Sequence, residues 1–147
     1  MVDHTTIMRN GRCMECGAKE LDQYSCYEQF GFPLAWEQQN PELYALHFWL
    51  VSCYMIQHPS NYTDAGYDQL VALFRDACDH DWDAATILRE NRERIQTVGK
   101  IANPIPSNER SRIPRSWTRT INDVYIGGEA MAIDNIKKWR DAIRSEL

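Results

Sequence analysis

The hydrophobic residues of this chain recur mostly at spacings of three and four, which places them on one face of a helix. The first such stretch covers residues 21–38, where Gly31 and Pro33 interrupt the pattern. Because both residues weaken a helix interior, we expect a helix with a bend or a restart near Phe32. The next stretch, residues 43–57, is apolar almost all round, which is typical of a central, buried helix.

The ends of this central helix are marked by residues with strong positional preferences. Asn40, Pro41 and Glu42 supply a capping residue, a proline at the first helical position and an acid in the first turn. His58-Pro59 ends the helix, because the residue before a proline is pushed out of the helical region of backbone space. The connection to the preceding helix is short, so the two helices are expected to be antiparallel neighbours.

The remaining sequence predicts three more helices, about residues 70–77, 83–98 and 129–146. Three prolines in residues 103–119 predict an extended, Pro/Arg-rich strap before the last helix. Residues 118–126 have the β-branched and aromatic content of a short strand or turn. The fold class predicted from these patterns is mainly α, a small bundle of about five helices that forms a single domain over residues 1–147.

Composition and charge narrow the classes of partner. No apolar run approaches the roughly 18 to 20 residues that span a bilayer, and the first ten residues lack the apolar stretch of a signal peptide. We therefore expect a cytoplasmic protein without a membrane partner. Residues 1–83 contain four Lys or Arg and thirteen Asp or Glu, a net charge of −9, whereas residues 84–147 have a net charge of +4. The acidic half makes nucleic-acid binding unlikely, and only the local cluster Arg110, Arg112, Arg115 and Arg119 leaves that alternative open.

The candidate chemistry begins at Cys13-Met14-Glu15-Cys16-Gly17, a pair of cysteines three residues apart, followed by Cys26. Two such thiolates can bind one metal ion, and zinc prefers four nitrogen or sulfur ligands. In a reducing compartment, five cysteines favour metal binding or free thiols over disulfides. A redox role is less attractive, because a redox pair normally opens a helix after a strand and no strand is predicted here. The simplest alternative is a pair of free surface thiols.

Helix geometry bears on which histidine completes the site. His47 and His58 are separated by about 16 Å along a helix that rises 1.5 Å per residue, so one ion cannot bind both. Counted outward from the short connection, Cys26 lies roughly 6 Å along the axis from His58 and roughly 10 Å from His47. We therefore predict a zinc site formed by Cys13, Cys16, Cys26 and His58, with His47 as the alternative fourth ligand. A helix-end imidazole that donates to a carbonyl of the last turn is an equally reasonable role for His58.

A candidate pocket lies along the second helix, where His47, Val51 and Tyr54 share a stripe and Glu37 stands near the hairpin turn. A core stripe with one buried polar pair is the alternative interpretation. Two function classes follow. In the first, a structural zinc ion stabilises a helical module that binds an unknown small molecule or protein. In the second, three protein ligands and a water make a small metal-dependent hydrolase, with Glu37 and His47 as general base and orienting partner.

Several short motifs together resemble an uncharacterised bacterial family that is known only as a domain of unknown function. The motifs over residues 13–62 are Cys13-x-x-Cys16-Gly17-Ala18, Cys26 before an aromatic residue, Leu34-Ala35-x-Glu37, His47, Val51-x-x-Tyr54 and Gln57-His58-Pro59. A weaker echo is Ala132-x-x-x-Ile136-x-x-Trp139, where the family often has a histidine at the position of Ala132. The resemblance implies a small, mostly helical, cytosolic protein that binds zinc, and it implies no activity. Whether the protein is an enzyme stays open.

Overall fold

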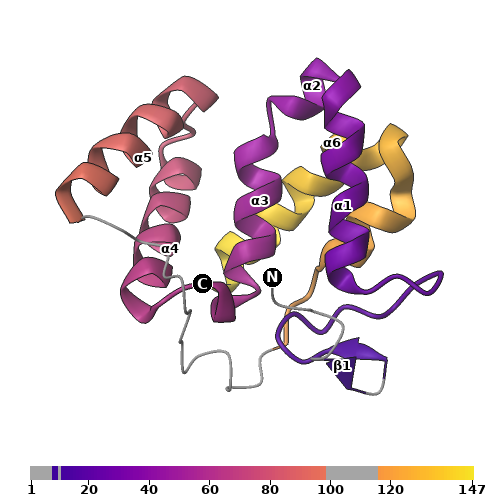
Figure 1. Cartoon of the computed structure of the whole chain (residues 1–147). Helices are drawn as coiled ribbons and strands as arrows, with labels where there is room; N and C mark the ends of the chain where they lie inside the picture. Colours follow the sequence, from indigo (N-terminus) through magenta and orange to yellow (C-terminus); the bar gives the residue numbers. More distant parts are fainter. Residues whose placement is uncertain (1–7, 10, 99–115) are drawn as a thin grey trace.

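The computed structural model describes residues 8–9, 11–98 and 116–147 of the 147-residue chain, and these residues are mainly helical (Figure 1). The predicted fold class, mainly α, is therefore confirmed. Residues 103–115 of the predicted strap, with Arg110, Arg112 and Arg115, lie outside the described residues. The elements are β1 (Met8–Arg9), β2 (Arg12–Cys13), α1 (Cys26–Trp36), η2 (Glu37–Gln39), α2 (Pro41–Tyr44), α3 (His47–Ile56), η3 (Pro59–Asn61), α4 (Asp64–Asp79), α5 (Ala84–Val98) and α6 (Ile121–Glu146).

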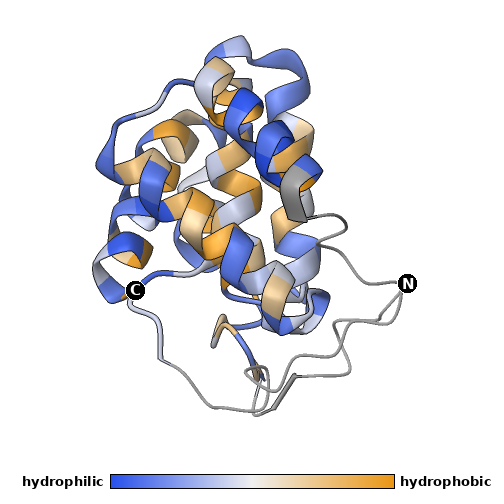
Figure 2. Ribbon diagram, turned by 90° about the vertical axis from the view of Figure 1, so that its left-hand side faces the viewer, coloured by the Kyte–Doolittle hydropathy of each residue, from blue (hydrophilic) through white to orange (hydrophobic). Residues whose placement is uncertain are grey.

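Helix α3 runs through the middle of the molecule and packs against α1, α4 and α6 (Figure 1). Along these helices hydrophobic and hydrophilic positions alternate, and the hydrophobic ones face the interior (Figure 2). Trp139 and Ile136 from α6, Leu50 from α3 and Phe74 from α4 are completely buried. The core is therefore built where the central helix meets its three neighbours, and α5 lies at its edge, packed on α4.

Helix α1 differs from the prediction at both its start and its middle. It begins at Cys26 rather than at residue 21, because Ser25 forms a capping box with Glu28: the Glu28 N–H donates to the Ser25 hydroxyl and the Ser25 N–H donates to the Glu28 carboxylate. It also continues through Pro33 without the restart expected near Phe32. Pro33 is buried, so tertiary packing outweighs its poor helix propensity.

The apolar stretch from residue 43 to residue 57 is two helices rather than one. Asn40 caps α2 with Pro41 at the first helical position, as predicted, but α2 ends after a single turn at Tyr44. Leu46, with φ −98° and ψ 12°, separates it from α3. Although this backbone departs from helical values, the apolar spacing continues across the break and gives no sign of it.

The segment predicted as a short strand or turn, residues 118–126, is also corrected. Thr120 caps α6 and forms a capping box with Asp123, so the last helix begins at Ile121. The closing helix predicted from residue 129 is confirmed as its C-terminal part. Between the two parts Gly128 has φ 71° and ψ −177°, a conformation open essentially only to glycine, and it kinks the helix.

Candidate metal centre

The first two cysteines lie in a tight loop that turns their side chains toward one point. Strands β1 and β2 pair antiparallel, and Cys13 ends β2. The Gly17 N–H donates to the Cys13 carbonyl over 2.9 Å, and Gly17 then turns the chain with a positive φ of 79°, which glycine adopts readily. The Ala18 N–H then points at the Cys16 sulfur, 3.4 Å away. These contacts within residues 13–18 define the turn that carries Cys13 and Cys16.

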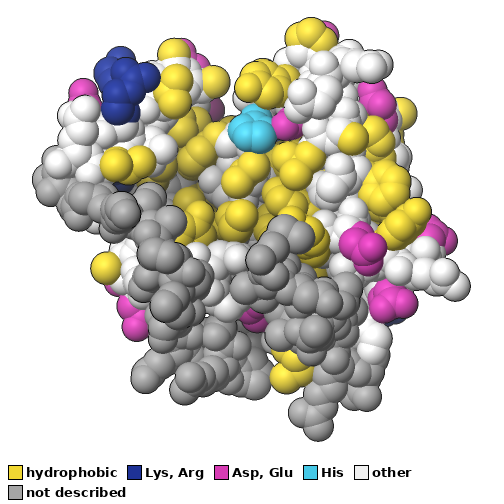
Figure 3. All heavy atoms as spheres, in the orientation of Figure 1, with side chains coloured by type: hydrophobic (Ala, Val, Ile, Leu, Met, Phe, Trp, Pro, Cys, Tyr) yellow, Lys and Arg dark blue, Asp and Glu magenta, His cyan; other side chains and the backbone are white. Residues whose placement is uncertain are grey.

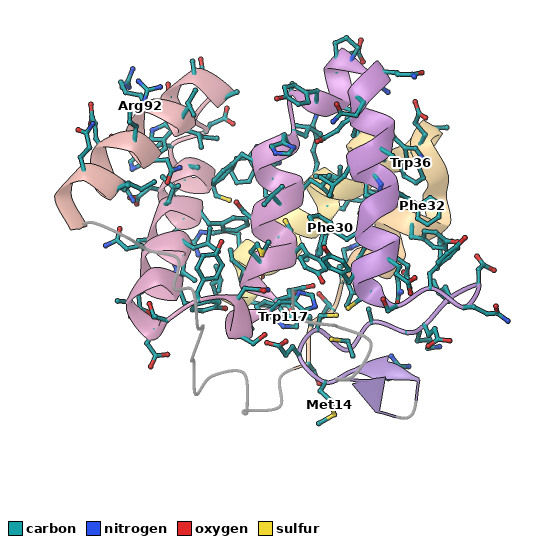
Figure 4. The ribbon with its side chains drawn as sticks, viewed as in Figure 1. Met14, Phe30, Phe32, Trp36, Arg92 and Trp117 are labelled. Carbon is teal, nitrogen blue, oxygen red and sulfur yellow. The ribbon has the colours of Figure 1, made fainter. Side chains whose placement is uncertain are left out.

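Cys26 and His58 reach the same point from two helices. Cys26 is the first residue of α1, and His58 directly follows the end of α3. The ligand atoms of Cys13, Cys16, Cys26 and His58 all lie within 4.8 Å of one another, and all four residues are buried. Nε2 of His58 is 3.7 Å from the Cys13 sulfur and 3.5 Å from the Cys26 sulfur. In Figure 4 sulfur atoms gather between the lower ends of α1 and α3 and the loop that carries Met14.

The imidazole of His58 is oriented for ligation by its other nitrogen. Nδ1 lies 2.6 Å from the carbonyl oxygen of Tyr54, one turn earlier in α3, and a carbonyl can only accept, so Nδ1 carries the proton. In the neutral ring Nε2 then presents its lone pair to the three sulfurs. The two roles considered for His58 from the sequence, helix-end donor and ligand, are therefore compatible in one side chain.

Binding of a cation would change the protonation state of the cluster. Hydrogen bonds from Cys16 and Cys26 hold the pKa of the Cys13 thiol far below its usual value, while hydrogen bonding to Cys13 and Cys26, with burial, raises the pKa of Cys16 well above it. Burial lowers the pKa of His58, but hydrogen bonds to the Cys13 and Cys26 sulfurs outweigh it and raise the pKa to about 10. Cys16 and His58 therefore keep protons that a metal ion bound to them would displace.

A set of polar contacts outside the four donors holds the loop against the bundle. Glu15, between the first two cysteines, accepts from the Ser60 N–H at 3.0 Å and from the Ser60 hydroxyl at 2.9 Å. Its carboxylate thereby ties the loop to the turn that carries His58. On the other side, the Asn122 amide donates to the Lys19 carbonyl at 2.9 Å and to Gln29 at 2.7 Å, which joins the loop to α6 and α1. Sequence reasoning missed these residues, because no spacing rule connects Glu15 to Ser60.

Tyr54 belongs to the wall of this cluster rather than to a pocket with His47. Its ring stacks on Phe30 at 4.1 Å and on His58 at 4.0 Å between centroids. Burial, then the nearby charges of Cys26 and Cys16, raise the pKa of its hydroxyl far above the usual value. Tyr54 therefore lies against the cluster on the side of the core. Its exposed fraction is only 1%.

The other two residues of the predicted pocket form a separate pair at the opposite end of α3. Nδ1 of His47 is 2.5 Å from Oε1 of Glu37. The Glu37 side chain is 1% exposed, whereas that of His47 is 46% exposed. His47 is one of the residues that line a groove between α3 and α5. Neither Glu37 nor Tyr54 lines this groove. The structure thus brings Glu37 to His47 but keeps His47 away from the three cysteines grouped with His58.

Comparison with known proteins places the chain in one family. The family of unknown function DUF5946 matches residues 11–147, which is nearly the whole sequence. No curated protein and no solved structure matches the chain. In the described part of the chain, no helix has both the length and the apolar character needed to cross a membrane. The chemistry of the site therefore follows from its own residues. They form a buried cluster of three cysteines and one histidine that could hold a metal ion.

Proposed function

The chain belongs to the DUF5946 family, whose function is unknown, and we propose that it is a zinc-stabilised helical binding module. Zinc is proposed as the metal because three sulfurs and one imidazole nitrogen are the ligands of its closed, four-coordinate structural sites. The observation that carries the proposal is the convergence of four buried donors within 4.8 Å. Bound there, the ion would add its binding free energy to folding by joining β2, α1 and the end of α3.

The alternative, a metal-dependent hydrolase, needs an open coordination position for water. Four protein donors would complete a tetrahedral shell, and each of the four residues is at most 2% exposed, so a substrate would have no path to the ion. Glu37 and His47, the residues considered for general-base chemistry, lie at the opposite end of α3 from His58. These observations favour a structural ion over a catalytic one.

The binding role is proposed for the helices, because the cluster itself is sealed. The groove between α3 and α5 encloses about 340 Å³, within the usual range of small-molecule pockets, and hydrophobic side chains dominate its walls. Zinc supports this role indirectly. The ion would hold the C-terminal end of α3 in place through His58, and the N-terminal end of the same helix, at His47, would contribute to the groove.

Cobalt substitution tests the closed site. Cobalt(II) in place of zinc should give the absorption of a four-coordinate, thiolate-ligated ion, and His58→Ala should weaken metal binding while His47→Ala leaves it unchanged. His80→Ala, a change at an exposed histidine, serves as the control. A water molecule bound to the cobalt ion beside only three protein donors would favour the hydrolase, and metal loss in His47→Ala rather than in His58→Ala would contradict the ligand set.

A further inference from the structure

The groove between α3 and α5 has the layout of a ligand site with one polar anchor. Its walls are largely apolar and include Phe48, Val51, Ile87 and Leu88. Leu88 is 60% exposed, an unusual state for a leucine that faces a hollow beside the core. In Figure 3 hydrophobic side chains gather over this face, and a histidine stands among them.

His47 is held so that one nitrogen faces outward. The buried carboxylate of Glu37 accepts from Nδ1, so the lone pair of the neutral ring is on Nε2. The Tyr44 ring stacks on the imidazole at 5.6 Å between centroids and lines the same groove. Among the described residues no side chain bonds Nε2, which leaves a fixed acceptor at the mouth of an apolar groove.

The charge of this anchor limits what it can bind. When the imidazole is protonated, the Glu37 carboxylate at 2.5 Å balances it, so the pair carries no net positive charge. The chain as a whole has a net charge of −5. An anionic head group would therefore gain little here, whereas a neutral hydroxyl could donate a hydrogen bond to Nε2 without repulsion.

From these observations we infer that the α3–α5 groove binds a small, neutral, apolar molecule through a hydroxyl group that donates to Nε2 of His47. Glu37 is the positioning residue that fixes the acceptor, and the apolar walls hold the body of the ligand. This inference rests on the proposed binding role of the helices and names its ligand class.

Three matched probes separate the ligand classes when titrated into the zinc-loaded full chain. 4-Propylphenol has the hydroxyl donor, 4-propylanisole is its methyl ether without the donor, and 4-propylbenzoate carries a negative charge. Calorimetry should find 4-propylphenol binding tightest, with the ether roughly tenfold weaker because one hydrogen bond is lost. Equal affinities for phenol and ether, preference for the benzoate, or no binding at all would overturn the inference.

Two variants locate the binding. Leu88→Asp should weaken the binding of 4-propylphenol roughly tenfold or more. Met131→Asp changes a similarly exposed residue outside the groove and should leave this affinity unchanged. His47→Phe, which keeps a planar ring but has no acceptor, should remove the preference for phenol over ether, a ratio that a general loss of stability does not alter. If size-exclusion chromatography instead shows a dimer that Leu88→Asp dissociates, a second copy occupies the groove and the inference is wrong.

Zinc content measured on the same samples distinguishes this failure from that of the proposed function. If the chain contains one equivalent of zinc but binds none of the three probes, only the inference about the ligand is wrong. A metal-free chain contradicts the zinc-stabilised module itself, whatever the probes do.

Discussion

At the scale of single residues, His58 connects the helical core to the cluster of sulfurs. Its Nδ1 is bound to the Tyr54 carbonyl and its ring stacks on Tyr54, so the direction of Nε2 is fixed before any ion arrives. Such an outer contact raises the basicity of a histidine ligand and lowers the entropy lost on metal binding. Glu15 holds the loop in place in a similar way, since its carboxylate accepts hydrogen bonds from the N–H and from the hydroxyl of Ser60.

Removing the Glu15 carboxylate tests this outer support. Glu15→Ala should lower zinc affinity by roughly tenfold, because contacts of this kind typically contribute that much, and competition with a zinc chelator measures it. Glu20→Ala is the control, since Glu20 is an exposed acid of the same loop. Equal affinities in the two variants would show that the Glu15–Ser60 contact does not support the site.

The four residues of the cluster could be predicted from sequence because the spacing of Cys13 and Cys16 is a local property, and helix rise, counted along an antiparallel pair of helices, favoured His58 over His47. Tyr54 was not placed correctly. It shares a helix with His47, but its side chain is directed into the core beside Phe30 by packing that a stripe of residues does not reveal. Glu15 and Ser60 were missed for the same reason: their contact depends on how the loop docks.

At the scale of elements, the kink in α6 is the feature that most constrains the backbone. Helices α1 and α6 pack together, and Tyr125 in the first part of α6 donates to Asp22 in the turn before α1. Gly128 redirects the chain after that contact so that the second part can bury Trp139 in the core. The sequence pattern missed the first part because its β-branched residues resemble a strand, although Thr120 and Asp123 had the spacing of a capping box.

A pair of glycine substitutions tests the kink. Gly128→Ala should destabilise the protein by about 1–3 kcal/mol, because alanine is strained at φ 71° even though no atom lies within 4 Å of the added carbon. Gly31→Ala is the matched change inside α1, where there is also open space and the backbone is helical, and it should stabilise by up to about 1 kcal/mol. Chemical denaturation measures both, and a neutral Gly128→Ala would mean that the kink is not required.

At the scale of the whole molecule, the cluster of three cysteines and His58 lies where distant parts of the chain meet. The loop of Cys13 contacts the turn after α3 through Ser60 and the start of α6 through Asn122. A metal ion at the four donors would close the same junction with bonds far stronger than these hydrogen bonds. We therefore propose that zinc holds the fold together at this junction and that ligand binding takes place at the opposite end of α3.

The most direct test of this claim is metal analysis of the purified chain combined with thermal unfolding before and after chelation. We expect about one zinc per chain, and a clear fall in melting temperature when zinc is removed, because the free energy of metal binding then no longer contributes to folding. Restoring zinc should restore the melting temperature. A chain that is purified without metal, and whose melting temperature responds neither to chelator nor to added zinc, would contradict the proposed structural role of zinc.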